Sequence, residues 1–292
     1  MLNGEKQTIK NGFKKDYIVY KQIQPEFSAI HTKLCGDGME LEEALLYLLG
    51  NGYALDLVNG ELELFNSTFL SDLCGSLGIY LEGYRYSNQQ TYYEEVRRNS
   101  LINVAPPMIY VTYDAGTYLS LVRNVYENKQ YEVIDPIAKE LRIIGEEQVD
   151  YQQPWYMMNS PRFMRPVFRD MNEMIQCSIY KMMQTYRQLR LRNDQSYYNF
   201  DKNGIAEKLA ETSNRKTKAY RDLFVKSLQY MEKMIGHSDR LEEGKQEILA
   251  LWDTDVQQKS QSYETAVLIC AAEEKIMQLI TSMTEENRGY GR

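Results

Sequence analysis

Two short runs, Leu119 to Val125 and Gln130 to Asp135, are joined by the polar residues 126–129. Strand-like runs around a short polar joint predict a β-hairpin. If the loop spans about three residues, Leu119 and Asp135 lie opposite each other at its open end. Paired side chains are only ~5 Å apart at Cβ, a spacing that suits a base and the carboxylate that orients it. Leucine cannot carry a proton, so position 119 limits this chemistry.

A thiol, Cys35, is the second candidate for chemistry. The leucine-rich run from Met39 to Gly50 has helical spacing, and Asp37 can cap that helix with Glu40 completing a capping box. Cys35 would then lie just before a helix N-terminus, where backbone N–H groups and the helix dipole favour a thiolate. The alternative is a small buried thiol beside a turn, and these residues alone favour that alternative.

Composition excludes several kinds of site. The chain has 292 residues, enough for two domains, and a net charge of −7 with a pI near 5.2, which argues against a nucleic-acid surface. Its four cysteines are widely spaced without a Cys-x-x-Cys pair, which favours free thiols over disulfides or metal ligands. Histidine occurs only as His31 and His237, so we expect no metal and no cofactor.

Two further features concern location and surface. The N-terminus has no apolar segment of signal-peptide type, and no apolar run approaches the length of a membrane span, so we expect a cytoplasmic protein. Tyrosine is abundant, with 24 residues against 8 phenylalanines. Its amphipathic ring suits a wet groove or an interface, although drift in composition would explain the same number.

Along residues 1–150 the pattern is that of an α+β domain. Strands are expected at Tyr17–Tyr20 and Ile79–Tyr86, and a helix from Thr91 to Asn103. The clearest strand is Met108 to Asp114, whose apolar, β-branched and aromatic residues predict a central, buried place in the sheet. The hairpin of the first paragraph follows it.

The second half of the chain is predicted to be helical. Two prolines and a loss of periodicity suggest a linker over Tyr151 to Pro161. Four amphipathic stripes follow it and imply a helical bundle. The stripes run from Phe168 to Leu189, from Leu209 to Ile235, from Ile248 to Trp252 and from Ala266 to Ile280.

The order of these features resembles a known family. A cysteine precedes a leucine-rich helix, a strand introduced by Pro-Pro ends in Asp114, and a hairpin ends in Asp135-Pro136. This order resembles the papain-like N-terminal domain of the butirosin-biosynthesis acyltransferase family; leader peptidases of peptide-exporting transporters share the fold pattern. The resemblance implies a papain-like, cysteine-protease-type α+β domain over residues 1–150 and a helical bundle over residues 160–292.

In such families a cysteine at a helix start attacks a thioester or amide, a histidine deprotonates it, and an acid orients the histidine. By this resemblance Cys35 takes the place of the nucleophile and Asp135 that of the orienting acid. Asp114 matches an acid often found after its strand. The histidine position is Leu119, or Ser120 if the register slips by one, and neither side chain can act as the base.

Two other observations bear on the triad. The Gly-Asp-Gly sequence after Cys35 moves the thiol away from the following helix, compared with the family's pattern. His31 is the alternative base, but it is only four residues before Cys35 and on the wrong element for that role. A complete triad is therefore not expected, and whether the chain is an enzyme stays open.

The resemblance implies a diverged acyltransferase-type protein of natural-product biosynthesis, of the nonribosomal-peptide or polyketide-like kind. It would bind an acyl or peptidyl carrier protein through the phosphopantetheine thioester. Without the base it would act as a scaffold or partner of an active relative, or promote amide formation by proximity, because thioesters are already activated. The alternative is a non-catalytic interaction module that binds a protein through its tyrosines. Either could form a homo- or hetero-oligomer.

Overall fold

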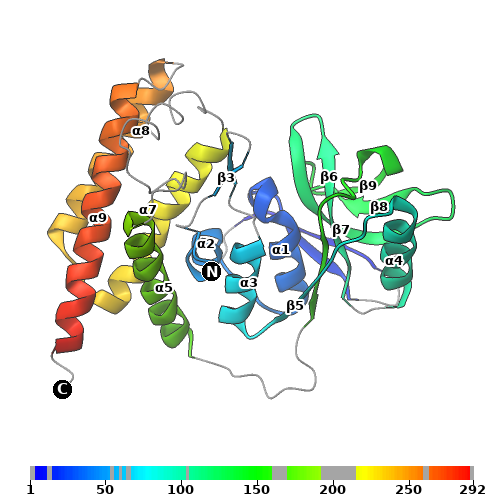
Figure 1. Ribbon diagram of the computed structural model, residues 1–292, viewed down its shortest axis with the longest axis horizontal. Coiled ribbons are helices and arrows are strands. Elements are labelled where there is room, and N and C mark those ends of the chain that lie inside the picture. The colour runs from blue at the N-terminus through cyan, green and yellow to red at the C-terminus, as the bar shows by residue number, and fades with distance from the viewer. Residues whose placement is uncertain are drawn as a thin grey trace. The chain divides into compact units, whose positions relative to one another are not determined.

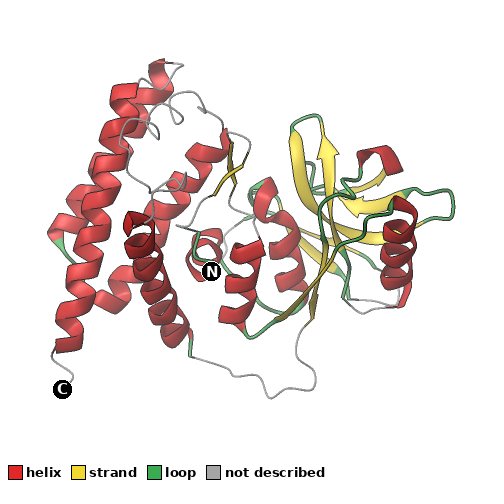
Figure 2. Ribbon diagram, viewed as in Figure 1, coloured by secondary structure: helices red, strands yellow, loops and turns green. Residues whose placement is uncertain are grey.

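The chain forms two compact units (Figure 1). Unit 1 is made of Met1–Glu43 and Gly78–Val167, and unit 2 of Ala44–Leu77 and Phe168–Arg292. Helices and an antiparallel sheet are both present, so the predicted α+β class is confirmed (Figure 2). The computed structural model describes residues 4–11, 15–52, 56–58, 61–63, 67–102, 105–159, 170–191, 215–258 and 263–289.

Unit 1 is built on a six-stranded sheet with the strand order β5-β10-β6-β7-β8-β9 and antiparallel pairing throughout. The strands are β5 (Tyr80–Tyr84), β6 (Met108–Tyr113), β7 (Gly116–Val125), β8 (Tyr131–Ile134), β9 (Leu141–Ile144) and β10 (Trp155–Asn159). Both β6 and the β7–β8 hairpin form where the sequence predicts them. The central place predicted for β6 is confirmed, because it lies between β10 and β7.

The linker predicted over Tyr151 to Pro161 is wrong in its middle. Residues 155–159 form β10, which pairs with β5 through Trp155↔Tyr84 and with β6 through Tyr156↔Met108. The two prolines on either side of this strand suggested a linker. The strand itself gave no strong signal, because its apolar run is short and lacks the polar alternation of a half-exposed strand. Its first four residues are all buried because β10 lies inside the sheet.

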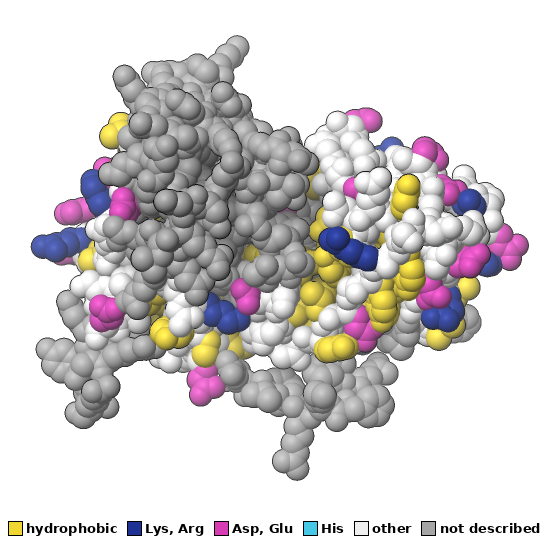
Figure 3. Space-filling model, viewed as in Figure 1, with side chains coloured by type: hydrophobic (Ala, Val, Ile, Leu, Met, Phe, Trp, Pro, Cys, Tyr) yellow, Lys and Arg dark blue, Asp and Glu magenta, His cyan; other side chains and the backbone are white. Residues whose placement is uncertain are grey.

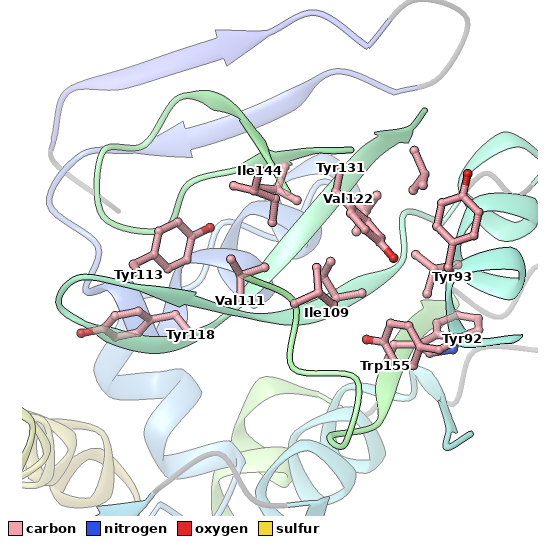
Figure 4. Packing of buried hydrophobic residues seen from close by; sticks show 14 of the residues in the cluster. Tyr92, Tyr93, Ile109, Val111, Tyr113, Tyr118, Val122, Tyr131, Ile144 and Trp155 are labelled. Carbon is pink, nitrogen blue, oxygen red and sulfur yellow. The ribbon is translucent and has the colours of Figure 1, made fainter. Parts of the chain in front are cut away.

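Strand β7 packs against a helix on each face of the sheet, α1 (Pro25–Gly36) and α4 (Gln89–Ile102). On the α4 face an aromatic core has formed, with Tyr113 and Tyr118 at one end and Tyr92 and Trp155 at the other (Figure 4). Because successive strand residues alternate between faces, Leu119 and Leu121 point to the opposite face from Tyr118 and Val122. The middle of β7 is therefore buried on both sides.

The N-terminal segment contains a helix that the sequence analysis missed. Strands β1 (Lys6–Ile9) and β2 (Tyr17–Tyr20) pair as a hairpin, and α1 begins at Pro25, a residue suited to a first helical turn. The helix predicted over residues 39–50 is shorter than expected, since α2 covers only Glu43–Leu49. The remaining short helix of unit 1 is η1 (Glu146–Gln148).

Unit 2 holds the four predicted helices, α5 (Met171–Leu191), α7 (Arg215–Ile235), α8 (Asp239–Gln258) and α9 (Tyr263–Gly289), which pack against one another. Phe168 and Leu209, which begin two of the predicted stripes, lie outside the described residues. Strands β3 (Asp56–Val58) and β4 (Glu61–Glu63) and helix α3 (Ser67–Leu77) also belong here.

The sequence placed the segment Ala44–Leu77 in the N-terminal domain, whereas the structure groups it with the helices of unit 2. Side-chain contacts tie it there. Asn51 Nδ2 donates to Thr185 Oγ1 at 2.8 Å, and Lys181 Nζ forms an ion pair with Asp72 at 3.0 Å. Such long-range pairs leave no local pattern in the sequence.

Close approach of α8 and α9 depends on a glycine. A Cβ at Gly244 would lie 2.8 Å from Cγ1 of the buried Ile276, whereas a Cβ at Gly75 in α3 would meet nothing within 4 Å. We expect Gly75→Ala to raise the free energy of unfolding by about 0.5–1 kcal/mol, and Gly244→Ala to lower it by about 1–3 kcal/mol. Urea unfolding followed by circular dichroism checks this. Equal gains in both variants would contradict the helix contact.

Candidate functional site

Cys35 lies at the end of a helix and not before one. It is the next-to-last residue of α1, whose C-cap Asp37 donates its N–H to the carbonyls of Lys33 and Leu34. Of the two interpretations, the favoured one is confirmed, since Cys35 is a buried thiol beside the turn that ends α1, and the thiol at a helix N-terminus is wrong. The negative end of a helix dipole disfavours a thiolate, so the local electrostatics are the reverse of those expected.

His31, the alternative base, belongs to α1 as Cys35 does. Residues four apart share one face of a helix, and Cys35 Sγ lies 3.5 Å from Nδ1 of His31. Both side chains are buried, with exposed fractions of 2% and 1%. The structure thus brings a thiol and an imidazole together, the first two members of a triad.

Burial keeps this pair neutral. It raises the pKa of Cys35 to about 12, with a smaller contribution from the charge of Glu40. It also lowers the pKa of His31 to about 4, against an opposing hydrogen bond with the backbone of Leu41. Both shifts disfavour moving the proton from the thiol to the imidazole. The pair is a packed thiol and a neutral ring, and not an activated nucleophile.

Strand β2 covers the pair through Tyr20. The ring of Tyr20 lies edge-on to that of His31, with centroids 5.4 Å apart, and its hydroxyl donates to Glu40 at 2.7 Å. This hydrogen bond is the main cause that raises the pKa of Tyr20 to about 12 and lowers that of Glu40. Lys6 on β1 completes the cover, 3.7 Å from Glu40.

Leu119 does not face Asp135 across the hairpin. The loop between β7 and β8 is longer than the three residues expected, since Val125 pairs with Tyr131. A β-bulge between Val122 and Asn124 then shifts the pairing back by one, so that Leu121 pairs with Ile134, and continuing this register puts Ser120 opposite Asp135. This corrects the first of the two predicted registers. Ser120 does not act as a base either. Its hydroxyl is buried and forms a hydrogen bond with the hydroxyl of Tyr113, 3.0 Å away.

The carboxylate of Asp135 holds its own turn together. Oδ1 accepts the N–H groups of Ile137 at 2.7 Å and Ala138 at 2.9 Å, and Oδ2 lies 3.2 Å from Nη1 of Arg142. Among the described residues, the carboxylate of Asp135 therefore bonds to neither Cys35 nor His31. Asp114, the other predicted acid, is exposed in the tight turn between β6 and β7.

Sequence reasoning missed Lys139, the last residue of the Asp135 turn. Its backbone is left-handed, with φ of 63°, and its N–H donates to the carbonyl of Asp135 at 2.9 Å. The side chain is 4% exposed, and among the described residues its Nζ has no hydrogen-bond partner. Nothing in the local sequence signals this burial, since a lysine after a turn is ordinarily solvated.

Charged groups from three elements act on the Lys139 amine. Burial lowers the pKa of Lys139 to about 8, although Glu43 at the start of α2, Glu26 in the first turn of α1 and Asp135 all favour the ammonium form. His31 is close enough for the lysine charge to lower the histidine pKa further. The Lys139 amine thus lies among ionisable groups from α1, α2 and its own turn, and it makes no hydrogen bond to any residue that the structure describes.

The whole chain matches no model of a known protein family, and no curated protein sequence matches it. In the described residues, no three His, Cys, Asp or Glu side chains are grouped so that they could hold a metal ion. None of the described helices has both the length and the apolar composition to cross a bilayer.

The structural role of Asp135 can be tested against Asp114. We expect Asp135→Ala to lower the free energy of unfolding by about 1–3 kcal/mol, because it removes the acceptor of the Ile137 and Ala138 N–H groups and of Arg142. Asp114→Ala should change it by less than about 0.5 kcal/mol, since the side chain is exposed. Urea unfolding measures both, and equal small effects would show that Asp135 is not needed for the turn.

The buried amine predicts a pH dependence. Between the folded pKa of Lys139, about 8, and the unfolded value near 10.4, the unfolded chain binds the extra proton, so the free energy of unfolding rises with pH. We expect this rise to be about 2 kcal/mol larger in the wild type than in Lys139→Met between pH 7.5 and 9.5. Lys129→Met, at the β7–β8 loop, is the control. A wild-type curve parallel to that of Lys139→Met would contradict the burial.

Proposed function

We propose that this chain is a diverged papain-like protein of the acyltransferase type that has lost cysteine catalysis. It binds an acyl or peptidyl carrier protein and its phosphopantetheine thioester, as a scaffold or partner subunit in natural-product biosynthesis in the cytoplasm. Two features support this class. A helix packs against the central strands of an antiparallel sheet, and an Asp-Pro dipeptide follows the β7–β8 hairpin.

The observation that carries the loss of catalysis is the position of Cys35. A papain-like nucleophile needs the start of the helix that packs on the sheet, where N–H groups stabilise a thiolate. At that start the chain has Gln24, Pro25 and Glu26, and its thiol lies at the opposite end of α1. With Leu119 and Ser120 on β7, neither register supplies a base.

The distribution of charge on the surface of unit 1 is consistent with a role in binding a protein partner. On the face shown in Figure 3, acidic and basic side chains are interspersed over the outer part of unit 1, at the right of the view. With a net charge of −7 this favours a protein partner over nucleic acid. A carrier-bound thioester is already activated, so positioning alone can promote an amide-forming step by an active relative.

The second candidate is an interaction module with no thioester ligand. Strand β5 lies at an edge of the sheet, and its Tyr80 is 63% exposed. Exposed edges pair readily with another strand, and exposed tyrosine suits protein contacts. This candidate differs from the first in one respect, because its partner needs no pantetheine arm.

The first experiment compares two forms of a carrier protein, with and without the phosphopantetheine arm, in binding titrations with the full chain. We expect the form with an acylated arm to bind at least about tenfold more tightly, a difference of about 1.4 kcal/mol. Equal binding of both forms would favour the interaction module. Binding of neither would overturn the carrier-protein proposal.

A second experiment tests the loss of cysteine catalysis. Intact mass is measured after incubation with an acyl-pantetheine thioester, for the wild type and for Cys35→Ala. We expect no adduct that depends on Cys35, and slow alkylation of this thiol, because it is buried and protonated. An acyl adduct present in the wild type and lost in Cys35→Ala would show that the thiol is a working nucleophile.

A further inference from the structure

Strand β9 has backbone hydrogen-bonding groups that no described strand uses. It is the last strand of the six-stranded sheet, and among the described residues it pairs with β8 alone. The carbonyl of Glu140 accepts the N–H of Asp135 at 2.8 Å and so points toward β8. Backbone groups of successive residues point to opposite sides of a strand. The N–H and C=O groups of Leu141 and Ile143 therefore point away from the sheet.

The side chains along this edge differ between its two faces. Glu140 and Arg142 are two residues apart and share one face, where both are exposed and carry opposite charges. Leu141 and Ile143 lie on the other face, and Ile143 is 55% exposed. An exposed edge strand with an apolar side chain is a place at which another strand can add to a sheet.

The order acid, apolar, base in Glu140-Leu141-Arg142 is complementary to itself when the strand is reversed. In a two-fold symmetric antiparallel pair, one residue lies opposite its own copy. If that residue is Leu141, each Arg142 lies opposite Glu140 of the other chain, which gives two cross-strand pairs of opposite charge. With Arg142 on the axis, two bases oppose each other. With Ile143 there, Glu140 opposes Glu146. Of these three registers, only the Leu141 register pairs both charges.

Arg142 can pair with a second acid while it keeps its own. Its Nη1 lies 3.2 Å from Oδ2 of Asp135, yet 51% of its side chain is exposed. A guanidinium has five N–H donors, so donors that face solvent can bond to Glu140 of a second chain. The contact therefore leaves the Asp135 turn intact.

We propose that β9 is a self-association edge, at which two copies of this chain pair antiparallel about Leu141 and join their six-stranded sheets. Leu141 exchanges N–H···O=C bonds with its own copy, and the second strand covers the edge beside Ile143. The strand has only four residues, so the interface is small, and small interfaces form weak, reversible complexes. This inference is independent of the proposed function and concerns the edge opposite to β5.

The test measures self-association of the full chain by sedimentation velocity, from about 1 µM to about 500 µM. We expect a reversible dimer with a Kd on the order of 10–100 µM. A chain that stays monomeric over this range would overturn the proposal.

Charge reversal tests the register. Glu140→Arg places a base opposite Arg142 at both pairs, so we expect dimerisation at least about tenfold weaker. Arg142→Glu has the reverse defect, and an equimolar mixture of the two variants should form a heterodimer that neither forms alone. Arg142→Glu also loses its pair with Asp135, so circular dichroism checks its fold. Glu140 is exposed, and its variant is a sufficient test without the mixture. Wild-type dimerisation by Glu140→Arg would overturn the proposal.

Ile143→Lys at the β9 edge and Tyr80→Lys at the β5 edge are matched variants, because each replaces an exposed apolar side chain, 55% and 63% exposed, by a lysine. Lysine on an edge strand opposes pairing with another strand. We expect Ile143→Lys to weaken the dimer at least about tenfold and Tyr80→Lys to leave it unchanged. A dimer lost in Tyr80→Lys and kept in Ile143→Lys would place the contact at β5 and refute this edge.

Discussion

Burial of α1 is the constraint on which the chemistry of unit 1 depends. Every residue from Phe27 to Cys35 is buried, although the run includes a histidine, a lysine and a thiol. Removing such groups from water penalises their charged forms. This one effect holds His31 neutral and Cys35 protonated, and it outweighs the hydrogen bonds and charges around them. In this run of α1 the charge that remains is carried by Lys33, which is paired with Asp37.

The same constraint divides the predicted triad into two structural networks. Around Cys35, the rings of His31 and Tyr20 are held by Glu40 and a backbone carbonyl. Around Asp135, both carboxylate oxygens bond to the turn and to Arg142. Each network satisfies polar atoms that are buried and would otherwise be costly. Lys139 is the exception, because its amine lies beside both networks and hydrogen-bonds to neither in the described chain.

The carrier-protein proposal depends on a resemblance in the order of elements and on the residues at the start of α1, where Gln24, Pro25 and Glu26 stand in place of a cysteine. It describes a protein in which the thiol of α1 packs against its neighbours instead of acting as a nucleophile.

Local patterns determined much of this fold. Strand alternation located β2, β5, β6 and the β7–β8 hairpin, and helical stripes located α4 and the helices of unit 2, because these periods repeat over neighbouring residues. The signals at α1 were overlooked: Pro25 at its start and Lys33 in its last turn are typical of a helix. Phe27, Ile30 and Leu34 also recur at helical spacing, but the run is short and follows a polar, lysine-bearing stretch.

Tertiary structure decided the site. The length of the β7–β8 loop and a bulge between Val122 and Asn124 together set the register that faces Asp135, and strand β10 was recognisable only from its place within the sheet. The sequence determined which groups could do chemistry, namely one thiol, one nearby imidazole and two acids. Burial decided what they do, because a pKa depends on solvation by residues distant in the chain. The unpartnered amine of Lys139 exists for the same reason.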